Sequence, residues 1–142
     1  MKYFLIMLAV MSGNLTANAN SGCQLSLSND VCANIKFKNS ISRKTDAEFE
    51  IHFTNPAGQV LSLDKNPQIK LWMIMKGGHG HGSDEVKIKK SGKKFNISNV
   101  WFLMLGKWQI KIAGEYKGKK FSGEPEICIR KNSKESAFGA CK

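Results

Sequence analysis

Two methionines and two histidines lie close together in the middle of the chain. Met73 and Met75 are two positions apart in an apolar segment, and His79 and His81 follow them with glycine on either side. Thioether sulfur and imidazole nitrogen are ligands that copper prefers, and glycine lets a loop bend closely around an ion. We therefore expect this segment to bind a soft metal, with copper as the cofactor.

A third methionine, Met104, lies in a second segment that is rich in apolar and aromatic residues. It is the only methionine outside the N-terminal segment besides Met73 and Met75, and it comes two residues before Gly106. Such a position is typical of the end of a β-sandwich, where loops cluster. The candidate metal ligands are His79, His81, Met75, Met104 and Met73.

Each of these residues also has an interpretation without metal. Methionine commonly fills gaps in a core, which is the stronger interpretation for Met73 and the weaker one for Met75 at the strand end. A glycine- and histidine-rich loop can simply be mobile and polar. His52 is expected to be a surface histidine on a polar strand face. Asp84 and Glu85 follow the loop, but oxygen ligands suit a harder metal.

Enzymatic activity finds little support in the sequence. There is no activated-nucleophile motif and no pair of carboxylates in an apolar setting, and the glycine-rich segment 77–82 lacks the Lys-Ser/Thr of a phosphate-binding loop. We expect a binding protein and not an enzyme, with no catalytic residues.

Alternating polar and apolar residues predict strands along most of the chain and almost no helix. Within 68–76, the alternation places Met73 and Met75 on one face, and Trp72 and Ile74 on the other. Short strands separated by turn signals are typical of an all-β fold, here an immunoglobulin-like antiparallel β-sandwich of about seven to eight strands. The predicted strands are 31–38, 47–54, 59–64, 68–76, 85–90, 94–100, 106–113, 116–121 and 125–130.

The N-terminal residues 1–19 have the features of a secretory signal peptide. Lys2 supplies a positive charge, 3–11 are apolar, and Ala-Asn-Ala at 17–19 is a cleavage signal. The apolar segment is shorter than the roughly 20 residues of a membrane-spanning helix. We expect periplasmic or secreted localisation after cleavage of the signal peptide.

The remaining chain is of the size of one domain. We expect a β-sandwich domain over 20–131 and a polar C-terminal tail over 132–142. No later segment is long and apolar enough to cross a membrane, so the mature protein is expected to be a soluble monomer without a transmembrane segment.

Four cysteines indicate disulfide bonds formed in an oxidising compartment: Cys23, Cys32, Cys128 and Cys141. Three pairings are open to them. We favour Cys32 with Cys128 and Cys23 with Cys141, because the first and last strands of a sandwich are often neighbours. The absence of a Cys-x-x-Cys motif argues against thiol redox chemistry and a zinc knuckle.

The chain carries a formal net charge of +11. Such a charge could attract nucleic acid, anionic lipid or an acidic partner. However, lysine alternates with apolar residues at 35–38, 86–89 and 109–112, which places it on the solvated face of half-buried strands. This pattern argues against nucleic acid and leaves weak adhesion to anions or to an envelope surface.

Two segments resemble the bacterial YtkA-like and FixH-like envelope proteins over 31–113. Residues 71–73 (Leu-Trp-Met) with 80–83 (Gly-His-Gly-Ser) are similar to one motif of that family, and 95–108 are similar to a second. The resemblance implies an immunoglobulin-like sandwich linked to copper handling or cytochrome oxidase assembly, with Met73, His81 and Met104 at motif positions.

This sequence departs from that family pattern in two places. It has extra residues at 76–79, where relatives usually place a methionine directly before Gly-His-Gly. It has Leu105 where relatives commonly have proline. The first difference either substitutes His79 for a methionine ligand or removes the site.

We therefore expect an exported envelope protein that binds Cu(I) for copper handling or delivery to an acceptor. The alternative is a metal-free immunoglobulin-like interaction or assembly module, which would contact an envelope protein partner through the glycine- and histidine-rich loop and the lysine-rich faces. A third hypothesis is a pH-sensing loop, since histidine changes charge near neutral pH.

Overall fold

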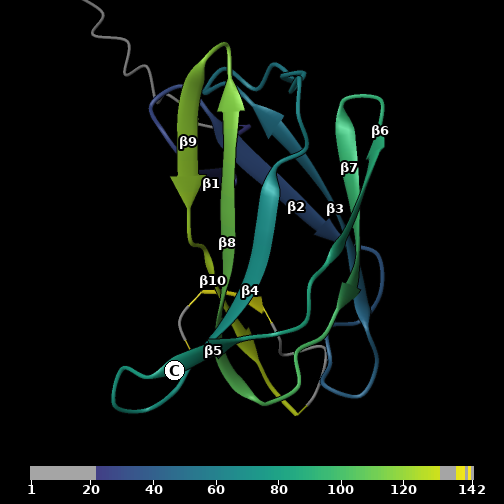
Figure 1. The fold of residues 1–142 in the computed structure, drawn as a ribbon, viewed down its shortest axis with the longest axis vertical. Coiled ribbons are helices and arrows are strands. Elements are labelled where there is room, and N and C mark those ends of the chain that lie inside the picture. The colour runs from purple at the N-terminus through teal and green to yellow at the C-terminus, as the bar shows by residue number, and fades with distance from the viewer. Residues whose placement is uncertain (1–21, 132–136, 140, 142) are drawn as a thin grey trace, which may run out of the picture.

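The computed structural model describes residues 22–131, 137–139 and 141 (Figure 1). The expected signal peptide at 1–19 lies outside these residues, as does most of the polar tail at 132–142. Every regular element that the structure describes is a β-strand, and the strands form two antiparallel sheets. The all-β sandwich predicted from the alternation is confirmed. Among the residues described, no helix is long and apolar enough to cross a membrane.

The first sheet has five strands in the order β1-β2-β3-β7-β6. Its strands are β1 (Leu25–Ser26), β2 (Cys32–Phe37), β3 (Ala47–Thr54), β7 (Lys94–Val100) and β6 (Lys87–Ser91). The second sheet has six strands, in the order β11-β10-β8-β4-β5, with β9 also paired to β8. Its strands are β11 (Ala137–Phe138), β10 (Glu126–Ile129), β8 (Gly106–Tyr116), β4 (Gln68–Ile74), β5 (Gly80–Gly82) and β9 (Lys119–Gly123).

The described residues form more strands than the seven to eight expected. The additional strands β1, β5 and β11 have only two or three residues, too few to show an alternating pattern. The predicted strand at 59–64 is wrong, since only an isolated bridge from Val60 to Thr54 forms there. By contrast, β8 continues past Gly114 to Tyr116, because it pairs with β9 along this stretch. Gly114 lies opposite Phe121, whose ring occupies the space that a side chain at position 114 would need.

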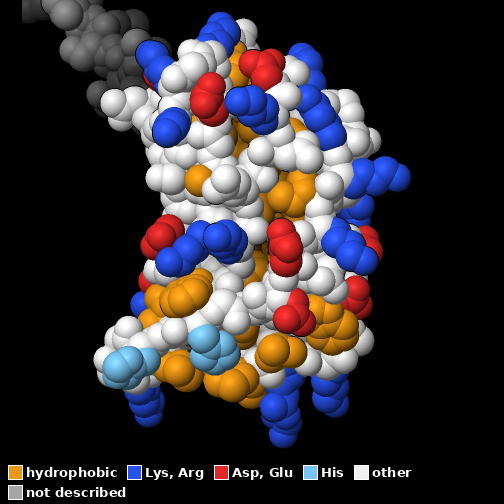
Figure 2. Space-filling model, viewed as in Figure 1, with side chains coloured by type: hydrophobic (Ala, Val, Ile, Leu, Met, Phe, Trp, Pro, Cys, Tyr) orange, Lys and Arg blue, Asp and Glu red, His pale blue; other side chains and the backbone are white. Residues whose placement is uncertain are grey.

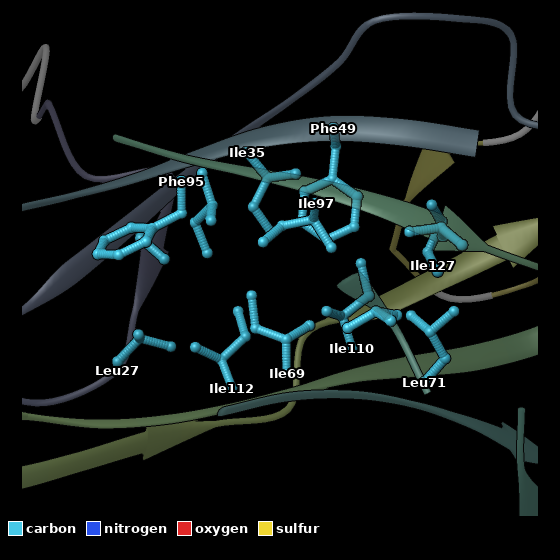
Figure 3. Close-up of a cluster of buried hydrophobic side chains, with 14 of the residues drawn as sticks. Leu27, Ile35, Phe49, Ile69, Leu71, Phe95, Ile97, Ile110, Ile112 and Ile127 are labelled. Carbon is cyan, nitrogen blue, oxygen red and sulfur yellow. The ribbon is translucent and has the colours of Figure 1, made fainter. Parts of the chain in front are cut away.

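The core lies between the two sheets. Figure 3 shows Ile35, Phe49 and Ile97 of the first sheet facing Ile69 and Ile112 of the second. These side chains are at most 7% exposed, and burying one of this size contributes about 1.5–3 kcal/mol to stability. The two sheets are therefore joined through apolar contacts made by the inward half of each alternating strand.

Both disulfide bonds are local. They join Cys23 to Cys32 and Cys128 to Cys141, so all four cysteines are paired as expected, but the favoured pairing of Cys32 with Cys128 is wrong. The reason is that Cys32 lies on β2 in the first sheet and Cys128 on β10 in the second. Each cysteine instead meets a segment that folds back along its own sheet: β1 beside β2, and β11 beside β10.

Candidate metal site

The β4–β5 hairpin brings methionine and histidine together in pairs. It projects from the lower end of the second sheet in Figure 1. The strand register sets Met73 opposite His81. Residues directly opposite on antiparallel strands point to the same face, with Cβ atoms about 4.5–5.5 Å apart. Met73 and His81 are therefore side-by-side neighbours on the face that is continuous with the core.

The pairing continues by one more step into the turn. The Met75 N–H donates a 2.8 Å hydrogen bond to the His79 carbonyl, and the Gly78 N–H donates a 3.3 Å bond to the Met75 carbonyl. Met75 and His79 lie one residue beyond β4 and β5, and continuing the alternation of the two strands by one step assigns them to the face of Met73 and His81. Four of the five candidate ligands thus share one face of one hairpin, with methionines on one side and histidines on the other.

The four residues differ in their exposure to solvent. Met73 is 6% exposed and belongs to the core, which supports the interpretation of this residue as core filler. Met75 is half-buried and packs against the core, whereas His79 and His81 are exposed. Figure 2 shows two histidine side chains at this end of the molecule with apolar side chains beside them. An ion could approach from solvent through the histidines and meet the methionines behind them.

The glycines around His81 have a structural cause. A Cβ atom on Gly80 would overlap the Trp72 indole and the Met73 carbonyl, and one on Gly82 would lie 3.6 Å from the Trp72 ring. Trp72 covers the outer face of β5, and the Lys111 ammonium lies 4.8 Å from its ring centroid. These glycines therefore make room for Trp72, which holds β5 against β4 and leaves His81 on the opposite face.

The turn itself needs glycine for a different reason. Gly77 and Gly78 have φ angles of 88° and 80°, in a region that side chains with a Cβ rarely adopt. The glycine- and histidine-rich segment is thus a tight turn followed by the short strand β5.

Met104 lies at the same end of the sandwich but on a different element. It belongs to the loop 101–105, which leads into β8 beside the end of β4, where Ile74 pairs with Lys107. Its side chain is 40% exposed, and its carbonyl accepts a 2.9 Å hydrogen bond from the Trp108 indole. The Met73 methyl group lies 3.7 Å from the position of a Cβ on Gly106, close to this loop. Met104 is outside the strand pairing that aligns the other candidate ligands, so its position relative to the hairpin depends on the conformation of the loop 101–105.

The other candidates lie elsewhere. His52 is on β3 in the first sheet, between Asn34 and Lys94, away from the β4–β5 hairpin. Asp84 and Glu85 are exposed after β5. Among the described residues, no three His, Cys, Asp or Glu side chains come together as metal ligands.

The cross-strand pairing was not predicted, although the sequence contains a signal for it. The pairs Met73–His81 and Met75–His79 are symmetric about Gly77, as required for an antiparallel hairpin that turns there. The sequence alone also did not single out Leu103 and Leu105, which flank Met104 and are exposed.

The fold and this hairpin define a disulfide-bonded β-sandwich that presents methionine and histidine at one end. Comparisons of the chain with protein-family models, curated proteins and solved structures find no match. The functional argument therefore depends on the chemistry of the hairpin itself.

Proposed function

We propose that this chain is an exported protein that binds Cu(I) at the β4–β5 hairpin and holds it for copper handling or delivery to an acceptor. The observation that carries the proposal is the presence of two methionine–histidine pairs on one hairpin face, Met73 with His81 and Met75 with His79. Cu(I) is a soft ion, and thioether and imidazole together form a soft ligand set.

The burial of the ligands suggests what each contributes. His79 and His81 are exposed and supply the nitrogen ligands that first meet an incoming ion. Met75 supplies a half-buried sulfur, and Met73 lies behind as the neighbour of His81. Met104 adds a further sulfur from the loop 101–105 at the same end. Ligands that are partly open to solvent allow the ion to pass to an acceptor, and they hold it without catalysing a reaction.

Export is supported by the cysteines. The structure pairs all four of them in disulfides, and disulfides persist in oxidising compartments such as the periplasm or the extracellular space. Since no free thiol remains in the folded chain, cysteine does not compete with the hairpin for the ion.

A metal-free interaction module of the cell envelope is the second candidate function. It is favoured by Leu103, Met104 and Leu105, which are apolar and exposed on one loop. In this function the hairpin and the loop contact an envelope partner, and the methionines pack without binding metal.

A competition titration with Cu(I) under anaerobic conditions, on the disulfide-bonded protein without added thiols, separates the two functions. We expect one-to-one binding that His81→Ala weakens strongly, while the control His52→Ala, on the first sheet, leaves the affinity unchanged. Binding that is absent, or that both variants weaken equally, contradicts the copper proposal and favours the interaction module.

A further inference from the structure

Three consecutive apolar side chains are exposed at the tip of the loop 101–105. Leu103, Met104 and Leu105 are 53%, 40% and 39% exposed. The other large hydrophobic side chains with comparable exposure among the described residues, Val60 and Trp72, are isolated along the chain. Isolated exposed apolar residues are ordinary, but a run of three is unfavourable unless it has a function.

The loop is held firmly in this position. On one side Phe102 is fully buried, and on the other Trp108 is fully buried, with the two rings edge to face at 5.4 Å. The Trp108 indole also donates its hydrogen bond to the Met104 carbonyl inside the loop. These anchors fix both sides of the loop and direct the three side chains between them outward.

Positive charge surrounds this end of the sandwich. The neighbouring loops and strand ends contribute the exposed residues Lys44, Lys76 and Lys131. Figure 2 shows Lys or Arg side chains projecting past the apolar cluster at the lower end, while the acidic side chains in that view lie higher. Asp46, Asp84 and Glu85 are exposed at this end as well, so the excess of positive charge is that of the chain as a whole, which carries a net charge of +11.

We propose that this end of the sandwich, through the loop 101–105, docks on the surface of an anionic lipid bilayer. The apolar tip enters the headgroup region while the surrounding lysines contact lipid phosphates, which is the combination that holds peripheral proteins on anionic membranes. A bilayer requires no complementary shape. A protein partner would have to cover more of this end of the sandwich than these three side chains, because a stable protein interface commonly buries about 800 Å² on each partner.

This proposal does not depend on the copper proposal. Of the candidate copper ligands it involves only Met104, and its test changes Leu103 and Leu105 instead, with a metal chelator present. Docking and copper binding can therefore succeed or fail separately.

Sedimentation with lipid vesicles tests the proposal on the intact, disulfide-bonded protein in chelator. We expect binding to phosphatidylglycerol-containing vesicles, weak binding to pure phosphatidylcholine, and loss of binding at about 0.5 M salt, where charges are screened. The double substitution Leu103→Ser/Leu105→Ser should weaken the binding by about tenfold or more, because less apolar area is buried. The control is Val60→Ser: the Val60 side chain is 41% exposed, and its backbone forms an isolated β-bridge with Thr54, at the opposite end of β3.

The outcomes are distinct. Loss of binding in the double variant, with Val60→Ser unchanged and equal melting temperatures, supports docking through the loop. Equal binding of all three proteins would mean that the lysine-rich surface adheres without the loop, and the proposal would be overturned. Failure of the wild-type protein to bind either vesicle type also overturns it and leaves the exposed loop to a protein partner.

Discussion

Met73 and His81 lie directly opposite each other on β4 and β5, on the same face of the second sheet. One is a core residue with 6% exposure, and the other is exposed to solvent. The pair therefore connects the interior of the sandwich to its surface through a thioether and an imidazole. A second methionine–histidine pair, Met75 and His79, lies two residues further along each strand, with the methionine half-buried and the histidine exposed.

Gly80→Ala should disturb this hairpin, and Gly82→Ala should not. A Cβ at position 80 overlaps Trp72 and the Met73 carbonyl, whereas one at position 82 makes an ordinary 3.6 Å contact. We expect Gly80→Ala to lower the free energy of unfolding by about 1–3 kcal/mol, typical of overpacking, and to weaken Cu(I) binding. Thermal unfolding and the copper titration of both variants check this. Equal behaviour of the two alanine variants would show that Trp72 is not seated on Gly80.

Substitution by leucine separates the two roles of the methionines. Leucine keeps the apolar volume and removes the sulfur, so Met75→Leu should change the free energy of unfolding by less than about 1.5 kcal/mol while weakening Cu(I) binding. Truncation to alanine should lower the free energy of unfolding according to how deeply each methionine is buried. Met73→Ala should lower it by about 2–5 kcal/mol, and Met75→Ala by less, because Met75 is only half-buried. Denaturant titrations measure both costs. Unchanged Cu(I) affinity in Met75→Leu and Met73→Leu would mean that both methionines contribute only to core packing and do not bind the ion.

The ion pair of Glu50 and Lys94 on β3 and β7 should make stability depend weakly on pH. A 2.8 Å hydrogen bond from the Lys94 ammonium lowers the pKa of Glu50 below its ordinary value of 4.5. The folded state thus favours the ionised carboxylate. Its contribution is complete above the unfolded pKa and is lost as the pH falls through the lower folded pKa.

The variant Glu50→Gln tests this dependence. Compared with the wild-type protein, it should lose up to about 1 kcal/mol of unfolding free energy at neutral pH, since the Lys94 side chain is 51% exposed and solvent screens the pair. The difference should shrink at about pH 3 and in high salt. Lys94→Gln should show the same trend. A difference that persists unchanged in acid would contradict the assignment to this ion pair.

Removal of the C-terminal disulfide should destabilise the protein without unfolding the hairpin. Cys128 and Cys141 are 13 residues apart, and closing a loop of this size contributes roughly 3 kcal/mol at most. We expect the variant Cys128→Ser/Cys141→Ser to have a lower melting temperature, a retained β-sheet circular dichroism spectrum and unchanged Cu(I) affinity. Loss of copper binding in a folded variant would indicate that the C-terminal segment contributes to the site.

The sequence predicts the long strands well because they are half-buried. Within 47–54, alternation with a period of two predicts that Phe49, Ile51 and Phe53 share one face, and the structure buries all three. It also predicts that Met73 shares a face with Leu71, apart from Trp72, and the structure buries Met73 and Leu71 but not Trp72. The local pattern depends on a single strand and its exposure, so no knowledge of the partner strand is required.

Features that depend on contacts between distant parts of the chain were harder to predict. The disulfide pairing failed because sequence order does not say which sheet holds Cys32 and which holds Cys128. The strand β5 was missed because Gly80–Gly82 is short and glycine-rich, and its pairing depends on Trp72, which covers it from the neighbouring strand. The position of Met104 follows from how Phe102 and Trp108 anchor its loop, which no local pattern encodes.

Under the proposed export of this chain, the two local disulfides determine the order in which cysteines can pair. Each joins cysteines that are consecutive along the chain, separated by 9 and 13 residues. In a chain that crosses a membrane from its N-terminus, Cys32 emerges while Cys23 is the only other thiol outside, and Cys141 emerges when Cys128 alone is still unpaired. Oxidation in order of emergence thus yields the native pairs directly, so secretion of this protein should require a thiol oxidant but no disulfide isomerase.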